Sequence, residues 1–174
     1  KIFGFDINLL NEYFTKSIIS YCKFDFDQNK KLKNLPFRNE LIENTSHIKI
    51  INDSKSTNLE NSINKINQIN LKKKIIILGG YPKKSNVKKN IIKNSLILIF
   101  GPNRFRINKR IKYINSKLVT FIDLENLFKF LKVVVDKTKW DIILFSPGGE
   151  SSDQFNDYSH RGKVFNNYIK KFKI

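Results

Sequence analysis

The sequence predicts an α/β fold: a Rossmann-like three-layer α/β/α domain with a mainly parallel sheet between two layers of helices. Three apolar runs, at residues 75–78, 96–100 and 142–145, have the composition of strands that are buried on both faces. Segments with apolar residues at helical spacing separate these runs. Alternating strands and helices form parallel sheets, because each helix crosses one face of the sheet to reach the start of the next strand.

The N-terminal part of the sequence predicts one helix and two short strands. The helix covers residues 8–21, and its apolar face is formed by Leu10, Phe14 and Ile18. A polar link follows it. The two strands, within residues 35–43 and 47–51, are expected to pair across a turn at residues 43–46.

The segment NDSKSTN, residues 52–58, joins the second of these strands to another predicted helix. The apolar positions of that helix recur at helical spacing at Leu59, Ile63 and Ile66. Thr57, followed three residues later by Glu60, predicts a capping box at the start of the helix. Polar and charged side chains are therefore concentrated where a strand ends and a helix begins.

The C-terminal half continues the alternation of helices and strands. A short helix is predicted at residues 87–93, and a mixed basic segment at 103–117 leads to a strand at 119–122. The helix predicted at residues 124–135 has an apolar stripe formed by Leu124, Leu127, Phe128, Leu131 and Val135. The last helix is predicted at residues 159–172. Its apolar face, which we expect to face the core, is formed by Val164, Phe165, Tyr168, Ile169 and Phe172.

Composition limits the classes of function. The net charge of +18 is typical of proteins that bind nucleic acid or anionic membranes, but the lysines are dispersed and form no stripe with aromatic residues, which disfavours nucleic acid as the main partner. No run approaches the length of a membrane span, and no signal peptide is visible, so we expect a cytoplasmic protein. The sequence begins at Lys1 and contains no methionine, so we expect it to be a piece of a longer protein.

Three loops that follow predicted strands carry the candidate functional residues. Ligands of open α/β sheets bind beyond the carboxyl ends of the strands, so we expect these loops to cluster. Asp53 has the chemistry to ligate a cation or hold ribose hydroxyls, and Lys55 supplies a positive charge. Thr57 offers a hydroxyl at a helix start, which attracts anions. Lys83 or Lys84 can reach a carboxylate, and in the third loop Ser151 can bind an anion.

Several alternative chemistries lack their motifs. The sequence contains neither G-x-x-x-x-G-K-[ST] nor G-x-G-x-x-G, so it carries no phosphate cradle of either kind. The segment GGESS lacks the nucleophile-elbow pattern, which argues against a serine nucleophile at Ser151. One cysteine and two histidines do not form a metal-ligand constellation, so we predict no metal ligand in these residues.

Two long motifs resemble those of the Mur ligases that add D-glutamate. NDSKSTN resembles the family's DSKATN signature, and SPGGESSDQFNDYSHRG, at residues 146–162, resembles its SPACASxDQFxxFExRG segment. Three shorter matches keep the family's order: LPFR resembles LPHR, GGYPKK resembles GG-x-x-K, and LIFG resembles the strand before the next helix. The resemblance extends from about Gly4 to the last residue.

The resemblance implies a cytoplasmic three-domain enzyme of peptidoglycan synthesis. Residues 35–174 would be the Mur ligase C-terminal, D-glutamate-binding domain, and residues 1–34 the last helix of the central ATPase domain with its link. ATP would phosphorylate the carboxylate of UDP-N-acetylmuramoyl-L-alanine, and the amine of D-glutamate would attack the acyl phosphate, with Mg2+ as cofactor. The UDP-binding and P-loop domains are not in these residues, so we expect the chain to be inactive unless it is joined to them.

The resemblance also assigns individual residues. Around D-glutamate it places Lys55, which we take as the catalytic residue, together with Thr57, Lys83, Ser151 and Tyr158. On the nucleotide it places Asn11, Arg38 and Asp53. This sequence departs from the family at Phe37, where the family has His, at Tyr158, where Phe is usual, at Pro82, and in SPGGES. The choice between Lys83 and Lys84 stays open.

Three other interpretations remain open from the sequence. One is another Mur ligase or a folylpolyglutamate-type ligase, although those usually lack DSK and the DQF segment with a following RG. The second is a basic Rossmann-like nucleic-acid-binding domain. The third is a degenerate remnant without function.

Overall fold

The computed structural model describes residues 7–22, 35–44, 48–83 and 90–174. The chain divides into two compact units, Lys1–Asn34 and Leu35–Ile174. In the first unit the structure describes helix α1, Ile7–Tyr21, which confirms the predicted helix at residues 8–21. The predicted polar link, residues 26–34, lies outside the described residues.

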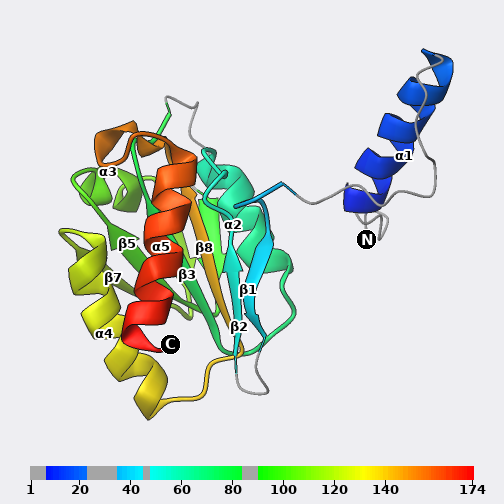
Figure 1. Ribbon diagram of the computed structural model, residues 1–174. Helices are drawn as coiled ribbons and strands as arrows, with labels where there is room; N and C mark the ends of the chain where they lie inside the picture. The colour runs from blue at the N-terminus through cyan, green and yellow to red at the C-terminus, as the bar shows by residue number, and fades with distance from the viewer. Residues whose placement is uncertain (1–6, 23–34, 45–47, 84–89) are drawn as a thin grey trace. The chain divides into compact units, whose positions relative to one another are not determined.

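The second unit is built on a six-stranded sheet with the order β1-β2-β8-β3-β5-β7 (Figure 1). Its strands are β1 Glu40–Asn44, β2 Lys49–Asn52, β3 Lys74–Gly79, β5 Ser95–Phe100, β7 Lys117–Phe121 and β8 Ile142–Gly148. Only β1 is antiparallel to its neighbour, and the other adjacent pairs are parallel. The predicted mainly parallel sheet and the predicted pairing of the first two strands are therefore confirmed.

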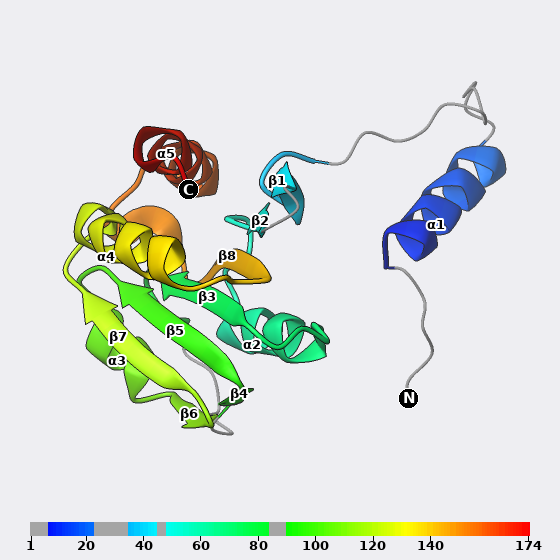
Figure 2. The ribbon, with the colours of Figure 1, turned by 90° about the horizontal axis from the view of Figure 1, so that it is seen from below.

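Helices cover both faces of this sheet, as Figure 2 shows. Helix α2, Leu59–Gln68, lies on one face, while α4, Leu124–Lys137, and α5, Tyr158–Phe172, lie on the other. Strand β3 shows why the fold needs both layers: Ile75 and Ile77 belong to the apolar cluster under α4 and α5, whereas Ile76 and Leu78 belong to the cluster under α2. The three-layer prediction is confirmed.

Three short elements complete the α2 face. Helix α3, Arg104–Asn108, follows β5, and strands β4, Asn90–Lys93, and β6, Ile111–Ile114, form a separate parallel pair. The prediction of a helix at residues 87–93 is wrong for residues 90–93, which form β4; residues 87–89 lie outside the described part. Ile92 is buried while its neighbour Ile91 is exposed, the alternation of a strand rather than a helix.

The capping box predicted at Thr57 is also wrong. The N-cap of α2 is Asn58, whose side chain accepts a hydrogen bond from the backbone N–H of Asn61 at 3.1 Å. Both residue types are good caps, and the helix starts one residue later than predicted. No helix among the described residues is long and apolar enough to cross a membrane.

Candidate functional site

Three loops meet at the carboxyl ends of β2, β8 and β3, which are adjacent in the sheet. The N–H of Gly148 donates to the carbonyl of Ser56 at 3.1 Å and links the loops after β8 and β2. Tyr81 and Glu150 exchange two backbone hydrogen bonds of 2.8 Å and link the loops after β3 and β8. The structure thus brings the segments that carry Thr57, Lys83 and Ser151 to one edge of the sheet.

Asp53 anchors the first loop from beneath. Asp53 is 3% exposed, and its carboxylate accepts hydrogen bonds from the Ser146 hydroxyl at 2.8 Å and from the Lys65 ammonium at 2.5 Å. Its other oxygen accepts the N–H of Asn39 at 3.2 Å. A buried carboxylate needs such donors, because desolvation of an unpaired charge costs several kcal/mol. Asp53 therefore fixes the loop after β2 against three other segments of the chain.

Arg161 holds two of the loops together from inside the domain. Its guanidinium is fully buried and donates to the carbonyls of Ser54 at 2.7 Å and Gly149 at 2.9 Å, and to the Ser54 hydroxyl at 3.1 Å. Burial lowers the pKa of Arg161 to about 10, and the negative charge of Asp153 partly opposes this shift. The side chain therefore stays protonated at neutral pH and cross-links the loops after β2 and β8.

Lys55 lies on the accessible side of the same loop. Its ammonium is 3.8 Å from the centre of the Tyr158 ring, a cation–π contact that orients a side chain with four rotatable bonds. Tyr158 is the first residue of α5, and its carbonyl accepts the Ser54 hydroxyl at 2.7 Å. The N–H of Lys55 donates to the carbonyl of Phe37 at 3.0 Å. Lys55 and Tyr158 are therefore held together.

The loops after β3 and β8 approach each other closely. A Cβ atom on Gly149 would lie 2.7 Å from the carbonyl oxygen of Gly79, so only glycine fits there. Beyond this contact Ser151 starts the short 3-10 helix Ser151–Asp153, and the Lys83 ammonium lies 3.4 Å from a carboxylate oxygen of Glu150. Glu150 stands where the resembling motif has Ala, so Lys83 has an internal partner here.

The remaining predicted site residues are less closely connected. Arg38 is exposed, but its neighbours Phe37 and Asn39 bond to Lys55 and Asp53, which puts its backbone beside the first loop. Asn11 lies on α1 in the other unit, and its side chain is outside the described part. Lys84 also lies outside the described residues.

The arrangement is suited to binding a carboxylate. Among the described residues the hydroxyls of Thr57 and Ser151 have no hydrogen-bond partner, while Lys55 lies on the loop after β2 and Lys83, paired with Glu150, lies on the loop after β3. Two cations and two hydroxyls can hold a small dianion by charge-assisted hydrogen bonds. The described residues contain no group of three or more His, Cys, Asp or Glu side chains placed to hold a metal ion.

Sequence reasoning missed three residues that shape this site. Ser146 and Lys65 hold Asp53, and Arg161 holds the two loops. Arg161 had a signal, since it belongs to the RG that follows DQF. Lys65 had none, because it is one lysine among many in a basic sequence.

Known proteins resemble this chain over most of its length. It is 33% identical over 94% of its length to a UDP-N-acetylmuramoylalanine–D-glutamate ligase of Fusobacterium nucleatum, and covers 40% of that relative. A protein of the same name from Buchnera aphidicola subsp. Acyrthosiphon pisum is 35% identical over 82% of the chain, which covers 32% of it. No protein-family model matches the chain.

A solved structure shares the fold. The MurF ligase of Thermotoga maritima, solved in complex with ADP, matches 94% of this chain with a TM-score of 0.57 and 18% sequence identity. The chain covers 38% of that structure. It thus spans less than half the length of each of these three proteins.

Proposed function

Because this chain belongs to the Mur ligase family and carries a Mur ligase C-terminal domain, we propose that it supplies the D-glutamate-binding part of an ATP-dependent ligase of peptidoglycan synthesis. Residues 35–174 would be that domain, and residues 1–34 the last helix of the central ATPase domain with its link. The division of the chain into units at Asn34 and Leu35 supports this assignment. The substrates would be D-glutamate and UDP-N-acetylmuramoyl-L-alanine, in the cytoplasm.

The observation that carries the proposal is the convergence of the three loops. They bring two ammonium groups and two unpartnered hydroxyls to one edge of the sheet, over a buried scaffold formed by Asp53 and Arg161. D-glutamate carries two carboxylates, and a rigid set of cationic and hydroxyl donors is the complement of such a ligand. Thr57, Lys83, Ser151 and Tyr158 would surround it.

In the proposed reaction the amine of D-glutamate attacks an acyl phosphate. A carbon–nitrogen bond forms, the bond from that carbon to the phosphate oxygen breaks, and inorganic phosphate leaves. Lys55 would offset negative charge that develops on the tetrahedral centre, and its contact with Tyr158 holds it ready. Preorganised charge of this kind requires no reorganisation during the reaction.

The nucleotide side of the proposal assigns Asn11, Arg38 and Asp53. Arg38 is exposed beside the first loop and can reach an anion. Asp53 already accepts hydrogen bonds from three donors, so its part in the nucleotide site would be to fix the first loop beside Arg38 through the N–H of Asn39. The described residues offer no carboxylate cluster that fits Mg2+, so the metal, like the phosphate cradle, would belong to the ATPase domain.

A chimeric ligase tests the proposal. This chain would replace the matching segment of the Fusobacterium nucleatum relative, with the unmodified relative as the reference. We expect the chimera to form product from ATP, UDP-N-acetylmuramoyl-L-alanine and D-glutamate, whereas the isolated 174-residue chain should show no turnover. Turnover by the isolated chain, or a folded chimera that makes no D-glutamate product, would contradict the proposal.

Glu150 is expected to compete with D-glutamate for Lys83. Changing Glu150→Ala removes the carboxylate that lies 3.4 Å from the Lys83 ammonium, and should lower the KM for D-glutamate in the chimera by about two- to fivefold, the range of an exposed ion pair. Glu125→Ala is the matched control, because Glu125 pairs with Lys129 at the same 3.4 Å on α4. An unchanged or raised KM in Glu150→Ala would remove Lys83 from the D-glutamate site.

A further inference from the structure

A concavity lies at the opposite edge of the sheet from the candidate site. Its volume is about 1050 Å³, and it lies at the amino ends of three parallel strands, where Lys74 starts β3, Ser95 starts β5 and Lys117 starts β7. None of the residues assigned to D-glutamate or nucleotide lines it. The pocket is therefore separate from the site described above.

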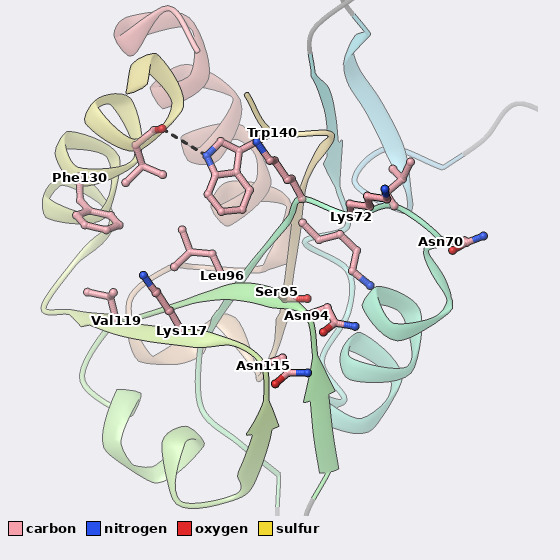
Figure 3. A pocket seen from close by; sticks show the side chains of 14 residues that line it. Asn70, Lys72, Asn94, Ser95, Leu96, Asn115, Lys117, Val119, Phe130 and Trp140 are labelled. Atoms are coloured by element: carbon pink, nitrogen blue, oxygen red, sulfur yellow. Dashed lines mark hydrogen bonds between the residues drawn. The ribbon is translucent and has the colours of Figure 1, made fainter. Parts of the chain in front are cut away.

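The floor of this pocket is apolar. It is formed by side chains from the sheet, from α4 and from the segment after α4, namely Leu96, Val119, Phe130, Val134 and Trp140. Figure 3 shows Leu96, Val119, Phe130 and Trp140 around one hollow. The indole N–H of Trp140 donates to the carbonyl of Val134 at 3.4 Å. The indole nitrogen is thus engaged within the protein, and an apolar surface is left toward the pocket.

Lysines surround this floor, and the lining contains no acidic residue. The ammonium of Lys74 has partners within the protein: it donates to the carbonyls of Ile66 and Ile69, both at 3.0 Å. Burial also lowers the pKa of Lys74. Lys72, Lys73 and Lys117 are exposed and form no ion pair among the described residues. Asp141 lies next to Trp140 in sequence, but its carboxylate accepts the backbone N–H of Lys73 at 2.9 Å.

We propose that this pocket binds an amphipathic anion: a small molecule with an aliphatic or aromatic body and one carboxylate, sulfonate or phosphate group. The body would cover the apolar floor, and the anionic group would pair with the unpartnered lysines at the rim. Binding pockets for small molecules combine such a floor with a few charged groups, and their volumes reach about 1,000 Å³. A phosphate without an apolar body would leave the floor exposed to water and gain little.

Trp140 allows a direct test, because it is the only tryptophan of the chain. Its fluorescence would be followed in the 174-residue chain during titration with decanoate and with 1-anilinonaphthalene-8-sulfonate. Decanol supplies the apolar body alone, and inorganic phosphate supplies the charge alone. We expect a saturable change with both amphipathic anions, at least about tenfold weaker binding of decanol, and no saturable change with phosphate.

Two variants test the two parts of the pocket. Lys72→Glu with Lys117→Glu should weaken decanoate binding about tenfold or more, and Val119→Phe, which fills the floor, should weaken it without any change of charge. The double change Lys163→Glu with Lys170→Glu is the matched control, since it alters the net charge equally on exposed positions of α5. This control should bind decanoate like the unmodified chain.

Each contrary outcome overturns the proposal. Equal binding of decanol and decanoate would show that the lysines have no part, and saturable binding of phosphate with the same affinity would show a simple anion site. Equal weakening by the α5 control would show non-specific attraction to a basic protein. Unchanged decanoate affinity in Val119→Phe, with circular dichroism unchanged, would show that the ligand binds elsewhere.

Discussion

Changing Arg161→Ala is expected to lower the free energy of unfolding of the unit 35–174 by about 3 to 6 kcal/mol. The change removes three hydrogen bonds at once and leaves the buried carbonyls of Ser54 and Gly149 without their donor. Each orphaned buried group costs about 1–3 kcal/mol, and the lost side-chain volume adds a cavity term. Because domains are stable by only about 5–15 kcal/mol, the loss is a large share of the total.

Urea unfolding followed by circular dichroism measures this effect. Arg161→Lys keeps the charge, but its single ammonium cannot reach the three acceptors of the guanidinium. We therefore expect its free energy of unfolding to lie between the values of the unmodified chain and Arg161→Ala. Lys163→Ala, two residues along the same helix and exposed, should change stability by less than about 0.5 kcal/mol. A free energy of unfolding for Arg161→Ala within about 1 kcal/mol of the unmodified chain's value would show that Arg161 is not the link between the two loops.

Three strands of the central sheet were predictable because burial on both faces leaves a continuous apolar run. Every residue of β3, β5 and β8 is buried. Their short, continuous runs of Ile, Leu and Phe are typical of strands that are buried on both faces. The small β4–β6 pair was not predictable on this basis. Strand β6 has only its first residue buried, and a short, mostly exposed strand resembles a polar loop in sequence.

The location of the candidate site was predictable from the sequence, but the buried residues that hold its loops in place were not. Strand order places the loops after β2, β8 and β3 side by side, and the alternation of helices and strands was enough to expect this. The partners of Asp53 are different: Lys65 is 12 residues away and Ser146 is 93 residues away along the chain. The pairing with Ser146 depends on the register of β2 against β8, and the pairing with Lys65 depends on how α2 packs on the sheet; the sequence displays neither.

Phe37 shows how a departure from the resembling motif is accommodated. Its ring is buried against Gly162 of α5, where an added Cβ would lie 2.4 Å from the ring, and its carbonyl accepts the N–H of Lys55. The phenyl ring at this position therefore has a packing role. Packing of the ring on α5 fixes the residue whose carbonyl holds the backbone of Lys55.

Changing Lys55→Ala in the chimeric ligase is expected to reduce kcat/KM for D-glutamate by about 10² or more. The ammonium is the cation of the first loop, and its place over the Tyr158 ring gives it a fixed orientation. Removing a charge that acts on the transition state should lower kcat, whereas loss of ground-state binding alone would raise KM with kcat unchanged. Initial rates at varied D-glutamate concentration separate the two.

Variants of Tyr158 show whether the orientation of Lys55 matters. Tyr158→Phe keeps the ring and should retain kcat within about threefold, while Tyr158→Leu removes the π face and should lower kcat about tenfold, because an ammonium on a flexible stem then samples many positions. Lys163→Ala serves as the charge control and should leave both kinetic constants unchanged. Full activity of Lys55→Ala would exclude a catalytic role, and equal kcat in Tyr158→Phe and Tyr158→Leu would show that the cation–π contact does not position the lysine.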